Sequence, residues 1–186
     1  MAMARVQKDG VDIDSLLSTI RSDPTYKTFR RIVQKAEEKL DIEKDRNEVF
    51  ALHSARTARK LYSSKMYNPS SLMNAAANDM QARSRIVEIR VKASYHIQVV
   101  EKAMESIQSH VITQYDSHLR KYSNQAQRTA LIRRVQKAAN TLITDGQDLL
   151  SLCDAIIGDI DKASYHISTL RDSMALLSQS QGGKVI

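Results

Sequence analysis

Residues that interrupt helices are scarce in this sequence of 186 residues, which contains five glycines and two prolines. Aromatic residues make up 5% of the chain, and tryptophan is absent. A protein of many short strands needs frequent turn residues and is rich in aromatic and β-branched side chains, so these absences exclude a typical sheet protein. Most of the abundant residue types, such as alanine, leucine, lysine and arginine, are good helix formers. The composition therefore predicts an all-α fold, with long helices in an elongated bundle or a coiled-coil assembly.

Cysteine occurs once, at Cys153, which excludes an intramolecular disulfide and a metal site built from several cysteines. This residue ends the apolar stretch LLSLC at residues 149–153, so we expect a buried structural thiol rather than a nucleophile. No base is evident beside it, the histidines are scattered, and a glycine-rich phosphate loop is absent from the sequence. We therefore predict that the protein is not an enzyme and binds no cofactor or metal.

Long hydrophobic runs are also absent. No apolar run approaches the roughly 20 residues that a membrane-spanning helix needs. The N-terminus lacks the apolar core of a signal peptide. These observations predict a cytoplasmic protein without a membrane partner.

Helix-start and helix-stop signals organise the chain. Asp23 is a candidate N-cap and Pro24 occupies the first helical position, after which nothing interrupts a helix until residues 66–71. Further on we expect one long helix over about residues 70–115 and another from residue 127, with Asp145–Gly146 as a candidate kink. The predicted segments are residues 1–23 with a short helix at 14–21, residues 24–68 as a long basic helix or arm, residues 69–179 as a helical core and residues 180–186 as a flexible tail.

The hexapeptide KASYHI occurs at residues 92–97 and again at residues 162–167. Apolar residues around both copies match at alternating spacings of four and three, which is the pattern of a heptad seam. Alanine and isoleucine of the hexapeptide fall on this seam, so we interpret the repeat as a packing solution that is used twice. Tyr95 and Tyr165 fall near the opposite side, where they meet another helix or partner chain or stand in solvent. Two such seams also predict a homo-oligomer. The matched positions are Ile86, Ala93, Ile97, Val100, Met104 and Ile107 in one copy and Ile156, Ala163, Ile167, Leu170, Met174 and Leu177 in the other.

Positive charge is concentrated in two windows without acidic residues, residues 49–78 and 117–144. Together they hold ten lysines and arginines, whereas the other 128 residues have a net charge of −3. Tyrosines lie in or beside both windows, with Tyr115 just before the second. Cations follow phosphates and aromatic rings stack on bases, so this mixture suits single-stranded nucleic acid. The alternative is a solvated basic face, or one that docks an acidic partner subunit. The candidate nucleic-acid contacts are Arg56, Arg59, Lys60 and Tyr62 in the first window and Arg120, Lys121, Tyr122, Arg128, Arg133, Arg134 and Lys137 in the second.

Three stretches of the C-terminal half resemble the UvsY family, the recombination mediators of large tailed phages. These are ANDMQARSRIV at residues 77–87, HLRKYSN at residues 118–124, and LLSLCDAIIGDI at residues 149–160 followed by YHISTLRD. They occur in the family's order over residues 77–175, with gaps between them, and residues 1–76 have no counterpart that we can place. The resemblance implies a helical protein that binds single-stranded DNA and helps to load a RecA-like recombinase. It also implies that Arg120, Lys121 and Tyr122 contact the DNA.

The sequence therefore predicts a single-stranded-DNA-binding recombination mediator that forms a homo-oligomer and has a RecA-like recombinase as a further partner. If phage-encoded, it would work in the host cytoplasm, with oligomerisation and DNA binding both in residues 69–179. The alternative is a non-enzymatic helical structural or assembly protein, for example a virion component, whose basic faces dock acidic partner surfaces.

Overall fold

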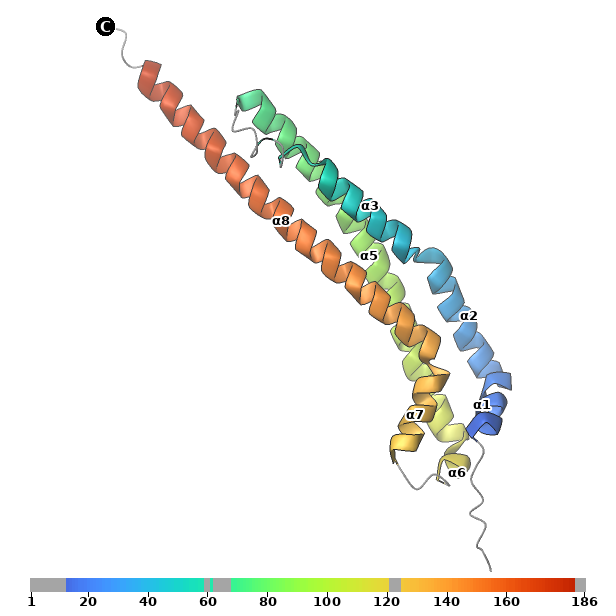
Figure 1. Ribbon diagram of the computed structural model, residues 1–186. Coiled ribbons are helices and arrows are strands. Elements are labelled where there is room, and N and C mark those ends of the chain that lie inside the picture. The colour runs from blue at the N-terminus through green and yellow to red at the C-terminus, as the bar shows by residue number, and fades with distance from the viewer. Residues whose placement is uncertain (1–12, 59–60, 62–67, 121–124, 183–186) are drawn as a thin grey trace, which may run out of the picture. The chain divides into compact units, whose positions relative to one another are not determined.

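The computed structural model describes residues 13–58, 61, 68–120 and 125–182 (Figure 1). Within these ranges the chain is helical and contains no strand, which confirms the all-α prediction. Two helices of 46 residues each, α5 and α8, account for more than half of the helical residues that the structure describes. The helices are α1 (Ile13–Ser22), α2 (Pro24–Lys39), α3 (Ile42–Ala55), α5 (Pro69–Gln114), α6 (Asp116–Leu119), α7 (Gln125–Val135) and α8 (Lys137–Gly182).

The start of α2 follows the signals in the sequence. The Oδ1 atom of Asp23 accepts a hydrogen bond of 2.7 Å from the backbone N–H of Thr25, and Pro24 is the first residue of the helix. An aspartate at this position satisfies a backbone donor that has no partner within the helix. The predicted short helix that precedes it is α1.

The single helix that we expected after Pro24 is interrupted twice, so that prediction is wrong. The first break lies between α2 and α3, where the side chain of Asp41 caps α3 by accepting a hydrogen bond of 3.1 Å from the backbone N–H of Lys44. The second lies at Arg56, whose extended backbone (φ −58°, ψ 126°) ends α3. Asp41 was recognisable as a cap, because Glu43 and Asp45 place negative charge in the first turn that follows it.

The later helices agree with the sequence in part. The helix expected over residues 70–115 is α5. Asp145 and Gly146, the candidate kink, lie within α8, so the helix is not interrupted there. An interruption lies at Gln136, between α7 and α8. Of the expected tail, residues 180–182 belong to α8, and residues 183–186 lie outside the described residues.

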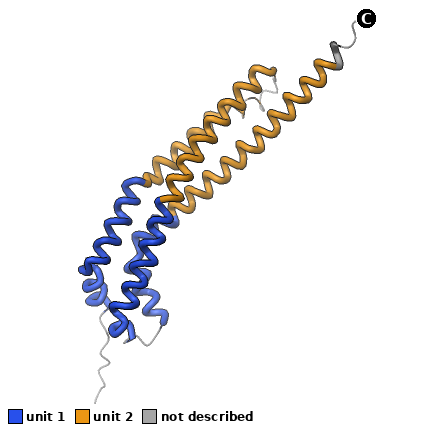
Figure 2. The backbone as a smooth tube through the Cα atoms, turned by 180° about the vertical axis from the view of Figure 1, so that it is seen from behind, with its two compact units in different colours: residues 1–39, 96–144 blue, residues 40–95, 145–186 orange. Residues whose placement is uncertain are grey.

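The chain divides into two compact units (Figure 2). Unit 1 comprises residues 1–39 and 96–144, and unit 2 comprises residues 40–95 and 145–186. Both α5 and α8 contribute one part to each unit. The core of unit 1 includes Leu16, Leu17, Ile20, Phe29, Val33, Val100, Ile107, Val111, Leu131 and Val135, and that of unit 2 includes Val49, Leu72, Ile86, Ile89, Leu149, Cys153, Ile156 and Ile160.

The two copies of the hexapeptide use their apolar residues in packing, as predicted. Ala93 and Ile97 of the first copy are buried, and so are Ala163 and Ile167 of the second. The two tyrosines stand on the surface, with 63% of Tyr95 and 72% of Tyr165 exposed. The second seam is less complete than the first, because its last position, Leu177, is exposed whereas the matching Ile107 is buried.

Cys153 is fully buried, as predicted. Burial raises the pKa of its thiol to about 11, since a thiolate is poorly solvated among apolar side chains. Among the described residues, no helix combines the length and apolar character needed to cross a lipid bilayer.

Candidate nucleic-acid interface

Positive charge is divided unequally between the two units. Unit 1 contains 15 lysines and arginines and 9 acidic residues, a net charge of +6. Unit 2 contains 13 lysines and arginines and 12 acidic residues, a net charge of +1. Since the whole chain has a net charge of +7, unit 1 holds nearly all of the excess. A polyanion is therefore attracted mainly to unit 1.

Arginines of α5 in unit 2 are held by carboxylates of neighbouring helices. Arg83 donates a hydrogen bond of 2.7 Å to Asp161 of α8, and this bond raises the pKa of the guanidinium and lowers that of the carboxyl group. Arg85 donates one of 2.6 Å to Glu48 of α3. Such pairs link α5 to the neighbouring helices. These cations therefore stabilise the helix packing, and acidic side chains of the same unit partly neutralise them. Arg90–Asp154 and Lys92–Asp45 are further pairs of this kind.

Arg56 corrects one of the sequence-based predictions. Its side chain is 1% exposed, and it donates two hydrogen bonds of 2.9 Å to the carboxylate of Asp79. A third bond of 2.6 Å, from Nη1, reaches the Oδ2 atom of Asp159. The expectation that Arg56 contacts nucleic acid is therefore wrong, because its guanidinium is buried and already bound by two carboxylates. The other predicted contacts of this window, Arg59, Lys60 and Tyr62, lie outside the described residues.

The start of the second basic window is only partly described. Arg120 is exposed and pairs with Asp116 one turn earlier, at 2.7 Å. Arg128 is half-buried, whereas Lys121 and Tyr122 lie outside the described residues. Tyr115, just before this window, is half-buried and donates a hydrogen bond of 3.0 Å to Asp23. Its ring is thus engaged within unit 1.

Three other predicted contacts, Arg133, Arg134 and Lys137, lie exposed around the junction of α7 and α8. The junction is anchored by Gln136, whose buried side chain donates a hydrogen bond of 2.9 Å from Nε2 to the carbonyl oxygen of Met104 in α5. A buried amide that is hydrogen-bonded in this way fixes the position of the helix that carries it. The structure therefore brings these three cations together on one well-anchored turn.

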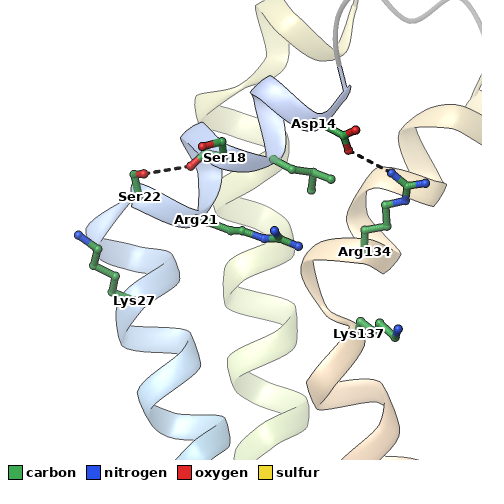
Figure 3. Close-up of a pocket in the computed structure, with 8 residues that line it drawn as sticks. Asp14, Ser18, Arg21, Ser22, Lys27, Arg134 and Lys137 are labelled. Atoms are coloured by element: carbon green, nitrogen blue, oxygen red, sulfur yellow. Dashed lines mark hydrogen bonds and ion pairs between the residues drawn. The ribbon is translucent and has the colours of Figure 1, made fainter.

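Arg134 and Lys137 line a surface hollow of about 590 Å³, which we call the basic hollow (Figure 3). Figure 3 shows Arg21 extending from α1 toward α7, which carries Arg134, while Lys137 lies just beyond at the start of α8. Lys27 is supplied by the first turn of α2. The hollow contains one acidic residue, Asp14, which pairs with Arg134 at 3.6 Å. It is lined by Asp14, Leu17, Ser18, Arg21, Ser22, Lys27, Arg134 and Lys137.

Our sequence analysis missed Arg21 and Lys27. They join the basic hollow because α1 packs against both α2 and α7. The contact between α1 and α7 joins residues that are more than 100 positions apart in the sequence. A weak signal was present, since residues 24–36 contain no acidic residue and four basic ones. We missed that stretch because it is shorter than the two acid-free windows.

The turn between α1 and α2 is held in place by Asp23. Its Oδ2 atom lies 3.0 Å from His110 Nε2 and 3.0 Å from the hydroxyl oxygen of Tyr115. The hydrogen bond with His110, together with those from Thr25 and Tyr115, lowers the pKa of Asp23 to about 2. Asp23 thereby ties the segment between Arg21 and Lys27 to the end of α5.

A second hollow of about 630 Å³, which we call the amide hollow, is lined by residues of α5, α7 and α8 and of the junction between α7 and α8. Lys137 lines both hollows. No acidic residue lines the amide hollow, and its polar side chains are mainly amides and hydroxyls. It is lined by Gln108, Thr129, Ile132, Arg133, Gln136, Lys137, Asn140, Thr141 and Thr144.

These features favour binding of an anionic polymer. Arginine and lysine side chains that line an open hollow bind phosphate or carboxylate oxygens without any covalent chemistry. In the part of the chain that the structure describes, no group of three or more histidine, cysteine, aspartate or glutamate side chains is arranged to hold a metal ion. No protein-family model, curated protein or solved structure matches this chain.

Proposed function

We propose that the protein binds single-stranded nucleic acid through unit 1, with the sugar-phosphate backbone of the strand lying over the α7–α8 junction. The observation that carries this proposal is that four basic residues, Arg21, Lys27, Arg134 and Lys137, line the basic hollow beside a single carboxylate, that of Asp14. Cations that gather on one surface provide affinity for phosphates without selecting a sequence. The pairing of unit 2 arginines with carboxylates adds support, because it leaves unit 1 as the principal source of exposed positive charge.

We further propose that the strand is DNA and that the protein is a recombination mediator that helps to load a RecA-like recombinase. The resemblance of residues 77–175 to the UvsY family supports this step. Residues 118–124, which resemble the DNA-binding segment of that family, come shortly before α7 in the chain, and α7 carries Arg133 and Arg134. We propose a homo-oligomer as the working form, because several copies of a modest basic surface on one strand bind far more tightly than one copy.

The proposal is tested by fluorescence anisotropy of labelled oligo-dT at several salt concentrations. For single strands, the logarithm of the binding constant falls with that of the salt concentration, with a slope of about −0.7 per phosphate contact. Four cations from the basic hollow predict a slope of about −3 for each subunit that binds. The absence of binding at low salt, combined with salt-dependent binding of an acidic polypeptide such as polyglutamate, would support the assembly-protein alternative instead.

A further inference from the structure

The amide hollow has a different chemistry from the basic hollow. It presents two side-chain amides from different helices, Gln108 of α5 and Asn140 of α8. Each amide offers both a hydrogen-bond donor and an acceptor. Ile132 adds an apolar surface to the lining. This combination suits a flat heterocycle with polar edges better than it suits a phosphate.

The hydroxyl groups of the three threonines in the amide hollow already donate hydrogen bonds within their own helices. Thr129, Thr141 and Thr144 donate to carbonyl oxygens one turn earlier in their own helices, at 3.1, 3.2 and 3.0 Å. Their hydroxyls can therefore only accept a further hydrogen bond, and their methyl groups add apolar surface. Specific donors in this hollow must come from the amides and from the two cations at its margin, Arg133 and Lys137.

The position of the amide hollow is set by the same anchor that positions the basic one. Gln136 donates to the carbonyl oxygen of Met104. Gln108 follows Met104 by four residues in α5 and so lies on the same face of that helix. The anchor thus holds Gln108 close to α7 and α8, and Lys137 connects this hollow to the basic hollow.

We propose that the amide hollow accepts a purine base from the strand whose phosphates bind in the basic hollow. This proposal rests on the proposed function and adds a preference for purine bases, which contacts with the sugar-phosphate backbone alone do not give. An amide pairs with the N6 and N7 atoms of adenine, and a guanidinium pairs with the O6 and N7 atoms of guanine. The bases of single strands expose these edges because they are free to leave the stack. Thymine and cytosine lack the N7 edge and cover less of the apolar surface of Ile132.

The experiment compares three labelled oligonucleotides of equal length: oligo-dT, the same strand with adenine at every fifth position, and the same strand with abasic sites at those positions. The wide spacing prevents both adenine stacks and the self-pairing of an alternating A–T strand. The wild-type protein should bind the adenine-containing strand about fivefold to tenfold more tightly than oligo-dT, because one good amide–adenine pair discriminates by at least that much. The abasic strand should bind no more tightly than oligo-dT.

Two variants, Gln108→Leu and Asn140→Leu, test whether the hollow causes this preference. Both should lower the affinity for the adenine-containing strand to that for oligo-dT, while the salt slope stays unchanged because no cation is removed. Gln98→Leu is the matched control, since Gln98 is an exposed residue of α5 in unit 1 that does not line the hollow. Asn140→Ala provides a second variant if Asn140→Leu does not fold, with folding checked by circular dichroism.

The outcomes separate the two proposals. Salt-dependent binding with equal affinity for all three strands would overturn the purine site and leave the proposed function intact. A purine preference that survives both substitutions would also overturn it. Failure to bind any of the strands at low salt would overturn the purine site together with the proposed function.

Discussion

The side chains of Arg56 and Asp79 form two parallel hydrogen bonds, Nε to Oδ1 and Nη2 to Oδ2, each 2.9 Å long, and both side chains are buried. Arg56 lies at the C-terminal end of α3 and Asp79 lies in α5. Asp159 of α8 accepts a further bond from Arg56 and lies 3.0 Å from His53 of α3. Three helices of unit 2 therefore meet at one buried guanidinium.

Replacing Arg56 with alanine should lower the free energy of unfolding by about 3 to 5 kcal/mol, because it leaves the buried carboxylate of Asp79 without its partner. The measurement is urea denaturation followed by circular dichroism. Arg83→Ala is the control, since it removes an exposed ion pair between α5 and α8 of the same unit and should have a much smaller effect. If Arg56→Ala leaves stability unchanged but weakens oligonucleotide binding, our assignment of Arg56 to the core is wrong.

The pKa of Asp23 gives a prediction about acid stability. Its pKa is lowered from 3.8 to about 2, so its contribution to stability is complete above pH 4 and is lost as the pH falls toward 2. Asp23→Asn keeps a good N-cap but removes the charge. The variant should be less stable than the wild type by about 1 to 2 kcal/mol at neutral pH.

The difference in the free energy of unfolding between Asp23→Asn and wild type should shrink between about pH 4 and pH 2. Denaturant titrations over that pH range provide the measurement. A difference that stays constant over the range would show that the interaction of Asp23 with His110 and Tyr115 does not depend on its charge.

Cys153 should be unreactive in the folded protein, because its thiol is buried and burial raises its pKa to about 11. We expect slow labelling by a thiol reagent such as DTNB under native conditions and rapid labelling in urea. Cys153→Ala should lower the free energy of unfolding by about 1 to 3 kcal/mol and leave oligonucleotide binding unchanged. Rapid native labelling, or loss of binding at an unchanged melting temperature, would contradict a structural role.

The basic hollow includes two cations that are remote in sequence from the others, so Arg21 and Lys27 provide an independent test of it. Substituting both with glutamine should weaken oligo-dT binding and make the salt slope shallower by about 1.4. Arg30→Gln together with Arg31→Gln is the matched control, because these exposed cations of α2 do not line the hollow. An equal loss in both double variants would mean that the hollow contributes no more than general positive charge.

The sequence was sufficient to predict the features that depend on local patterns. Asp23 and Pro24 marked the start of α2, and the heptad spacing identified buried residues such as Ala93 and Ile97. These features depend on helix capping and helical periodicity, which are determined by residues close together in the sequence.

Features that depend on tertiary contacts were harder to predict from the sequence. A count of charges cannot show that Arg56 is buried against Asp79, because that depends on how α3 packs against α5. The same reason explains why Arg21 and Lys27 escaped notice, since only the packing of α1 against α7 brings Arg21 toward Arg134. Charge density identified the α7–α8 junction as a candidate surface, and tertiary structure is needed to complete it.

The most direct test of the central claim compares two double substitutions that each remove two positive charges. Arg134→Gln with Lys137→Gln removes two cations that line the basic hollow of unit 1, and Lys44→Gln with Lys162→Gln removes exposed cations from unit 2. Oligo-dT affinity is measured by anisotropy over a series of salt concentrations, with folding checked by circular dichroism. We predict that the unit 1 variant binds more weakly, with a slope shallower by about 1.4, while the unit 2 variant stays close to wild type. Equal slopes for both variants and the wild type, with all three proteins folded, would contradict the claim that unit 1 binds the phosphate backbone.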